Sequence, residues 1–412
     1  MAVDVDHVND SLGSSKTVHT ATLDDSNLEL SITVLSRAVS MSSTPLYHDG
    51  DTIIGTVHIN SSKNSGIQDI SISLRGQHSC YGKDTTFLRL SHSVWSPERR
   101  TSHEGVYERN LRGTNIWNFS IPLPACCNAL DTGTSDTPLP PSFGGSGSVL
   151  PETINYEISC TVRRRFFSGP DEQLSVPIQY RPQTVAGSAP LSRSHAYNNG
   201  TPIPGPEVDA EGWSSFRSSC SGDFFSRREV NIDCEFSLAA PLEYARGGLI
   251  PFAVRVSTTD QQLLDLLAVT PDFLSIHLQR QVLCNTTLSA TFEKTVSSGR
   301  YWVTAKIQGA LLIAGEINAS AILQPSFQYG ALEVAYLVQF FIGAPGLHLK
   351  TASPIGAIPV QICARRAPGP RPISYAPTVS SEWDTTAALY SLPTIMGAAL
   401  FHKGADGEIV LG

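Results

Sequence analysis

The sequence predicts an all-β protein built from two tandem antiparallel β-sandwich domains. Three observations favour this fold class: a low content of charged residues, many short segments in which apolar and polar residues alternate, and a set of segments that occurs twice in the same order. Charged residues make up 16% of the 412 residues, below the roughly 25% of typical globular proteins. The 27 prolines and 32 glycines supply turns, and this composition favours short strands over long helices.

Alternation with a period of two, the pattern of a half-buried strand, occurs throughout the chain. The clearest case is INYEISCTVR, where Ile154, Tyr156, Ile158, Cys160 and Val162 share one face. Strands are also expected at TIIGTVHI, IQDISISLRGQ, NIWNFSIPLP, VNIDCEFSLAAPL, GLIPFAVRVS, DFLSIHLQRQVL, YWVTAKIQGALLIA, EVAYLVQFFI and AIPVQI. One stretch, TTDQQLLDLLAVTP at 258–271, indicates a short helix, or else a loop that packs leucines under a sheet.

The repeated set of segments is centred on two similar strings, LPPSF at 139–143 and LQPSF at 323–327. Each precedes a tyrosine-containing strand and then a strand with Pro and Ile. The matched pairs are HDGDTIIGTVHI with YARGGLIPFAVRVS, IQDISISLRGQ with PDFLSIHLQRQ, LPPSF with LQPSF, INYEISCTV with VAYLVQFFI, and VPIQY with IPVQI. Five matches in one order indicate two copies of a single sandwich unit.

Between the copies the composition changes to Ser, Gly, Pro and Asn without a sustained period, which is typical of a linker. We therefore expect a disordered segment at 1–24, a first sandwich at 25–183, a flexible linker at 184–228, a second sandwich at 229–365 and a tail at 366–412.

Charge and targeting signals narrow the function classes. The formal charge of −8 argues against nucleic acid as a partner. The N-terminus has acidic residues and no apolar core of a secretory signal, and no stretch has the length of a membrane span, so we expect a cytoplasmic protein. The eight cysteines show neither a CxxC pair nor regular spacing, which predicts reduced thiols and no zinc site. Because no secretion signal is found, we do not expect the six N-x-S/T triplets to carry glycans.

The stretches LYHDGDTIIGTVHI, ISISLRGQ, LPPSF, INYEISCTVRRRF and VPIQYRP resemble the N-terminal domain of arrestins, and the second half is similar to their C-terminal domain. The Ser/Pro-rich linker and long tail resemble α-arrestins, including fungal trafficking adaptors. The resemblance implies two antiparallel sandwiches without a catalytic site. It also implies docking onto cytoplasmic parts of membrane receptors or transporters, for endocytosis and protein transport.

Two departures from this family bear on mechanism. The α-arrestins recruit a ubiquitin ligase through PPxY motifs, but the nearest string here is PPSF at 140–143, which we interpret as a strand entry. Receptor-desensitising arrestins carry basic residues in the last strand of the first domain, where this chain has LSVPIQYRP. The sequence therefore does not support recruitment of a ligase through a PPxY motif, and it argues against phosphate-triggered release through a charged core.

The candidate binding residues are two groups of arginines. Arg163, Arg164 and Arg165 end a predicted strand and could meet acidic lipid headgroups or a phosphorylated peptide, although charges at strand ends also serve solvation. Arg227 and Arg228 follow two phenylalanines and form either a docking motif or the end of the linker.

The sequence shows no enzyme motif: HExxH, GxSxG and a Gly-rich phosphate loop are all missing, so we expect neither catalysis nor a cofactor or metal. The expected function is an arrestin-like adaptor that links membrane cargo to endocytic or ubiquitin machinery at the plasma membrane or endosomes. The alternative is a sorting scaffold of the wider arrestin-like group, such as a retromer-type subunit, that recruits no ligase.

Overall fold

The computed structural model describes residues 16–25, 28–61, 66–96, 111, 113–127, 137–144, 152–165, 170–284, 290–350, 354–377, 402–403 and 409–410. The chain divides into two compact units, Met1–Ile373 and Ser374–Gly412. The second unit holds one antiparallel pair, β23 (His402–Lys403) and β24 (Ile409–Val410). All other strands and both α-helices belong to the first unit.

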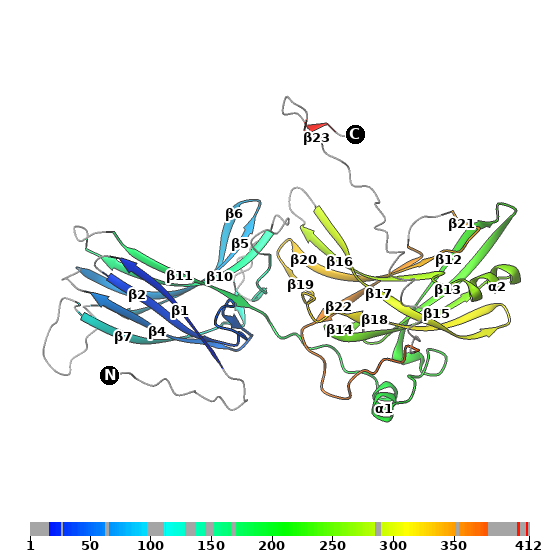
Figure 1. Ribbon diagram of the computed structural model, residues 1–412, viewed down its shortest axis with the longest axis horizontal. Coiled ribbons are helices and arrows are strands. Elements are labelled where there is room, and N and C mark those ends of the chain that lie inside the picture. Colours follow the sequence, from blue (N-terminus) through cyan, green and yellow to red (C-terminus); the bar gives the residue numbers. More distant parts are fainter. Residues whose placement is uncertain are drawn as a thin grey trace. The chain divides into compact units, whose positions relative to one another are not determined.

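The fold is nearly all β, as predicted, and its first two large sheets form a sandwich-like arrangement from residues 17–180 (Figure 1). One sheet has the order β1-β2-β4-β7 and the other the order β3-β11-β10-β5-β6. Their strands are β1 (Thr17–Asp25), β2 (Leu28–Ser36), β3 (Leu46–Tyr47), β4 (Thr52–Ser61), β5 (Ile67–Cys80), β6 (Lys83–Trp95), β7 (Gly113–Pro122), β10 (Glu152–Arg164) and β11 (Glu172–Tyr180). A small antiparallel pair joins β8 (Cys126–Cys127) to β9 (Thr137–Pro138).

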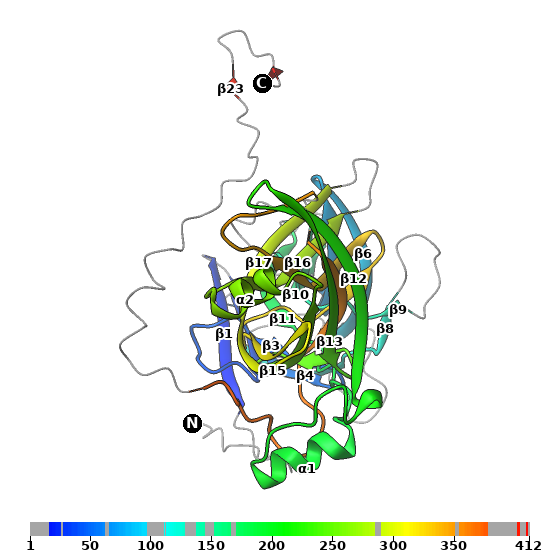
Figure 2. The same cartoon turned by 90° about the vertical axis from the view of Figure 1, so that its right-hand side faces the viewer.

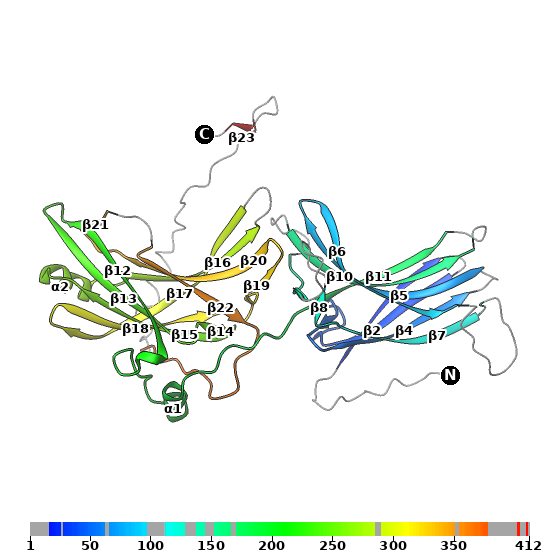
Figure 3. The same ribbon diagram turned by 180° about the vertical axis from the view of Figure 1, so that it is seen from behind.

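Residues 213–363 form a second set of strands (Figure 3). They are β12 (Trp213–Phe224), β13 (Arg228–Ala239), β14 (Glu243–Ala245), β15 (Gly248–Ser257), β16 (Leu274–Cys284), β17 (Ala290–Ile307), β18 (Ala310–Ala319), β19 (Phe327–Tyr329), β20 (Leu332–Ile342), β21 (Leu347–Leu349) and β22 (Gly356–Cys363). Their hydrogen-bonded order is β14-β22-β20-β16-β17-β18-β15-β13-β12-β21, and β19 pairs with β20 outside this path. The 18 residues of β17 pair with β16 up to Ser298 and with β18 from Gly299 onward. By this change of neighbour, β17 connects the strands on the β16 side of the curled sheet to those on the β18 side.

Alternating burial explains why these segments are strands. In β10 the predicted inward residues Ile154, Tyr156, Ile158, Cys160 and Val162 are all buried, which confirms the predicted face. In β7, Ile116 is 63% exposed while Phe119 and Ile121 are buried. These two strands thus contribute apolar residues to the core, where removal of that surface from water stabilises the fold.

The strand pairings of the first set are repeated in the second. A short parallel pair, β3 with β11, corresponds to β14 with β22. From there the order β11-β10-β5-β6 corresponds to β22-β20-β16-β17, and β1-β2-β4-β7 corresponds to β12-β13-β15-β18. The two copies of LPPSF-like sequence therefore lie in equivalent places of two equivalent strand arrangements.

Side-chain hydrogen bonds repeat as well. The Tyr156 hydroxyl donates to the carbonyl of Pro140 at 2.5 Å, and the Tyr336 hydroxyl donates to the carbonyl of Gln324 at 2.6 Å. In each copy, the backbone carbonyl of the second residue of the string thus accepts a hydrogen bond from the tyrosine hydroxyl of the strand that follows. A buried hydroxyl requires such a partner, so the tyrosine is fixed by the backbone that enters the strand.

The serine of each string makes the second repeated contact. The Ser142 hydroxyl accepts from the backbone N–H of Tyr180, and the Ser326 hydroxyl accepts from that of Ile362, each at 2.9 Å. The backbone of each serine also donates to the carbonyl of the same partner. The strings LPPSF and LQPSF therefore bind through their serines to the ends of β11 and β22.

The structure differs from the predicted boundaries at two places. β1 begins at Thr17, inside the segment 1–24 that was expected to be disordered, and residues 1–15 lie outside the described part of the chain. The expected linker 184–228 contains the helix α1 (Leu191–Asn199), a short 3₁₀ turn (Ala210–Gly212) and all of β12. Figure 2 shows α1 outside the sheets. Of the predicted tail, only 366–377, 402–403 and 409–410 are described.

The predicted short helix is confirmed as α2 (Gln261–Val269), with Leu263, Leu264 and Leu267 buried. The Asp260 carboxylate caps it by accepting from the Leu263 N–H at 2.9 Å. In the described part of the chain, neither α1 nor α2 has the length and apolar content needed to cross a bilayer.

Candidate functional site

The three arginines at the end of β10 do not act as one group. The Arg164 side chain is 7% exposed and pairs with Glu172 of β11 at 2.6 Å, while its backbone N–H donates to Asp171. Arg163 and Arg165 are exposed, and a bulge separates Arg163 from Arg164. The guanidinium of Arg164 therefore joins two strands, and a binding role for Arg163 and Arg165 stays a prediction.

Arg227 is the last residue of the turn between β12 and β13, and Arg228 is the first residue of β13. Arg228 pairs with Asp260 at 2.6 Å, and its guanidinium carbon lies 5.1 Å from the ring centre of Phe224. Because Asp260 also caps α2, this pair connects the helix to the hairpin. Both side chains are exposed to solvent, and Arg228 remains 44% exposed while it pairs with Asp260. A binding role for either arginine stays a prediction.

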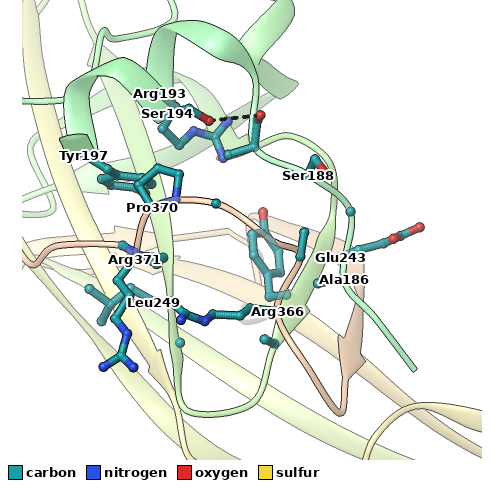
Figure 4. Close-up of a pocket in the computed structure, with 18 of the residues that line it drawn as sticks. Ala186, Ser188, Arg193, Ser194, Tyr197, Glu243, Leu249, Arg366, Pro370 and Arg371 are labelled. Carbon is teal, nitrogen blue, oxygen red and sulfur yellow. Dashed lines mark hydrogen bonds between the residues drawn. The ribbon is translucent and has the colours of Figure 1, made fainter. Parts of the chain in front are cut away.

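A cavity of about 700 Å³ was not predicted from the sequence (Figure 4). Its lining comes from three segments that are distant in the chain: 186–197 with the first part of α1, 241–251 around β14 and the start of β15, and 365–372 after β22. The volume lies within the roughly 300–1,000 Å³ of small-molecule sites. We call it the arginine cavity, because Arg193, Arg246, Arg365, Arg366 and Arg371 line it.

Helix α1 forms one wall of the arginine cavity. It begins after Pro190 and ends at Gly200, whose φ of 64° is the left-handed conformation that glycine adopts without strain. The Arg193 side chain points inward and donates to the carbonyls of Gly212 at 2.6 Å and Ala240 at 2.7 Å. Both acceptors are neutral, and the guanidinium carbon lies 6.0 Å from the centre of the Trp213 ring. The carboxylate of Asp209 attracts this charge from beyond ion-pair distance, but desolvation has the larger effect.

Backbone hydrogen bonds hold the other two walls together. The Ala186 N–H donates to the Arg365 carbonyl, and the Arg365 N–H donates to the Thr184 carbonyl, each at 2.9 Å. The Arg246 N–H donates to the Cys363 carbonyl at 2.9 Å. The end of β22 is therefore the shared support on which the segment before α1 and the segment after β14 are built.

Burial changes the acidity of two arginines in the cavity. Desolvation lowers the pKa of Arg193 from its ordinary value. Desolvation lowers the pKa of Arg246, and repulsion from the charge of Arg181 lowers it further. Both shifts have the same physical meaning: a positive charge at these places is less stable than in water, and a negative charge brought close would stabilise it.

A second buried polar pair was also missed from the sequence. His78 Nε2 of β5 lies 2.9 Å from Glu152 Oε2 of β10, and the Glu152 side chain is fully buried. The other carboxylate oxygen of Glu152 has no hydrogen-bond partner among the described atoms. The sequence did not reveal this pair, because each residue lies in a strand where apolar and polar residues alternate.

The cysteines and other potential metal ligands of the described residues form no metal-binding site. All eight cysteines are free thiols, as predicted. Burial raises the pKa of Cys160 to about 12. Within the described residues, no group of three or more His, Cys, Asp or Glu side chains is arranged to hold a metal ion.

Neither a family model nor a curated protein matches this sequence. The fold and the arrangement of side chains therefore carry the functional proposal.

Proposed function

We propose that this chain is a non-catalytic, arrestin-like adaptor that binds cytoplasmic regions of membrane receptors or transporters and links them to endocytic or ubiquitin machinery. The observation that carries the proposal is the internal duplication: two equivalent strand arrangements, each with the same tyrosine and serine bonds to its LPPSF-like string. The proposed domains are two arrestin-like sandwiches, formed by the strands of residues 17–180 and of residues 213–363. The same motifs in the same order carry the resemblance to arrestins.

Edge strands offer the means of binding. β1 and β7 end one sheet and β6 ends another, and among the described residues each has a hydrogen-bonded neighbour on one side only. An extended peptide can add to such an edge through main-chain hydrogen bonds, while side-chain pockets supply specificity. We assign this role to the long edges of the first domain, since β6 spans 13 residues and β7 spans 10.

One observation favours the alternative, a sorting scaffold without a ligase. The only PPxY-like string is part of the fold: the Ser142 hydroxyl bonds to Tyr180, and Phe143 is buried and pairs with Ile154. A motif used in this way is not free to enter the groove of a partner domain. An adaptor of this kind would reach a ligase through another surface, or not at all.

Affinity purification of the full chain from detergent-solubilised membranes of the source cell tests the proposal. We expect a receptor or transporter to be enriched together with endocytic or ubiquitin-ligase components. Coat or sorting subunits without cargo and ligase would favour the scaffold. Recovery of soluble metabolic enzymes alone would contradict both functions.

A further inference from the structure

The lining of the arginine cavity has a charge opposite to that of the whole chain. Five arginines and one acidic residue, Glu243, give the lining a formal charge of +4, whereas the chain carries −8. In Figure 4 the Glu243 side chain lies at the edge of the cavity opposite Arg371. The positive charge is therefore concentrated where the chain on average is negative.

The ion pairs of the described residues do not neutralise this charge. The arginines that form such pairs are Arg37, Arg75, Arg164, Arg217 and Arg228, and none of them lines the cavity. Arg193 bonds to two carbonyls, and the Arg365 side chain donates to the amide oxygen of Gln183 at 2.6 Å. Neutral acceptors satisfy these donors without neutralising the charges, and the attraction of Asp209 for Arg193 is smaller than the effect of desolvation.

Like charges held around one cavity repel each other, and the repulsion is stronger where water is partly excluded. Arg193 is only 7% exposed, so solvent screens it poorly. Arg366 and Arg371 are exposed and can move toward an anion. The fold thus keeps one buried cation in place and adds flexible cations at the mouth, an arrangement that an anionic ligand would stabilise.

We propose that the arginine cavity binds a small soluble ligand that carries several phosphate groups. Guanidinium groups bind phosphate oxygens through paired N–H donors. A single phosphate group, with a charge of roughly −2 at neutral pH, leaves much of the +4 lining uncompensated, whereas a compact polyphosphate balances it. The cavity of about 700 Å³ also has the volume of a small-molecule site.

A small ligand fits better than a membrane surface. Arg193 belongs to α1, and its side chain is buried where it donates to the carbonyls of Gly212 and Ala240. A planar array of headgroups does not reach this place. The bound ligand would contact all three lining segments and therefore hold α1 and the segment 365–372 against β14 and β15. This inference does not rest on the adaptor function, because it concerns a different surface from the edge strands.

Calorimetric titration of the full chain with inorganic tripolyphosphate tests the proposal, with orthophosphate and sulfate at matched ionic strength as comparison anions. We expect tripolyphosphate to bind at least about tenfold more tightly than either comparison anion. In the variant Arg246→Gln/Arg366→Gln we expect the Kd to rise at least about tenfold. Arg193 is left unchanged, because its bonds to two backbone carbonyls support the fold.

The matched control is Arg89→Gln, which removes an exposed arginine of β6 and should leave the Kd unchanged. Circular dichroism confirms that each variant is folded. The proposal is overturned if tripolyphosphate binds no more tightly than orthophosphate, or if Arg89→Gln weakens binding as much as the cavity variant. It is also overturned if vesicles with anionic lipid or a singly phosphorylated peptide bind more tightly than tripolyphosphate at the same arginines.

Discussion

Tyr156 and Tyr336 occupy equivalent positions in the two copies and make the same hydrogen bond. Each is buried, and each hydroxyl donates to a backbone carbonyl of the string that precedes its strand. Burial is the main reason that the pKa of both hydroxyls is raised, to about 12 for Tyr336. Both therefore remain neutral donors over the whole physiological range.

Tyr156→Phe and Tyr336→Phe should destabilise the protein by similar amounts. Each change removes one buried hydrogen bond and leaves a carbonyl without its donor, which costs about 1–2 kcal/mol. The free energy of unfolding in urea, measured for both variants, checks this expectation. An exposed serine change, Ser91→Ala in β6, serves as the control and should have little effect. A large cost for one tyrosine and none for the other would contradict equivalent roles.

Asp51 gives a pH-dependent prediction. Burial raises its pKa, but the hydrogen bonds from the Arg37 side chain and the His48 N–H, together with the charge of Arg37, outweigh burial, so that the pKa is lowered overall. A lowered pKa means that the ionised form is stabilised by folding. This contribution is complete above the unfolded-state pKa and is lost as the pH falls through the folded-state value.

Asp51→Asn should therefore destabilise the protein at neutral pH by about 1–2 kcal/mol, near the lower end for charged hydrogen bonds because the pair is partly exposed to solvent. The difference from wild type should shrink as the pH falls below about 4. Urea unfolding at several pH values measures it, with the exposed Asp24→Asn as control. A difference that stays constant with pH would show that the charge of Asp51 is not responsible.

At the scale of elements, the alternation of apolar residues predicted β4, β5, β7, β10, β13, β15, β16, β20 and β22. The expected strands did not include β1, β2 or β6, nor did they include β12. Its sequence, WSSFRSSCSGDF, is rich in Ser and Gly, and most of its residues are at least partly exposed. The strand forms because all twelve residues pair with β13 and its end pairs with β21. Pairing with a neighbour decides strand formation here, and local composition does not report it.

Helix α1 was missed for a related reason. Its sequence, LSRSHAYNN, has few strong helix formers, and its inward residues Arg193, Ala196 and Tyr197 do not form an apolar stripe. α2, in contrast, has a leucine-rich face and a capping aspartate, and was predicted. Tertiary contacts that cannot be read from local sequence therefore account for the structure within the expected linker.

Two strand glycines lie beneath aromatic rings. A Cβ atom at Gly55 of β4 would lie 2.6 Å from the ring of Phe119, and one at Gly315 of β18 would clash with the ring of Phe252. Gly55→Ala and Gly315→Ala should each cost about 1–3 kcal/mol through overpacking. Gly343→Ala has open space around the new Cβ atom and is the matched control. Thermal unfolding measures all three, and equal stability of the three variants would contradict this packing.

At the scale of the whole molecule, the sequence predicted the duplication but not the arginine cavity. The matched strings are local patterns, so a single sequence reveals them. Arg193, Arg246 and Arg366 lie in three separate segments, and only the fold brings them to one cavity. The proline- and arginine-dense string RRAPGPRP at 365–372 was the one local signal for it.

The same contrast applies to the candidate arginines. The run at 163–165 stood out as a charge cluster, but pairing of Arg164 with Glu172 divides it. Arg228 likewise pairs with Asp260 across 32 positions of the chain. Sequence patterns identify which residues are charged, whereas only tertiary structure shows which of those charges are already paired.

Proximity labelling in the source cell, with the labelling enzyme fused to the N-terminus of the full chain, tests the adaptor function most directly. The account predicts that a membrane receptor or transporter is labelled together with components of endocytosis or ubiquitin ligation, above a control with the labelling enzyme alone. Labelling confined to soluble metabolic enzymes, with no membrane protein enriched over that control, would contradict it.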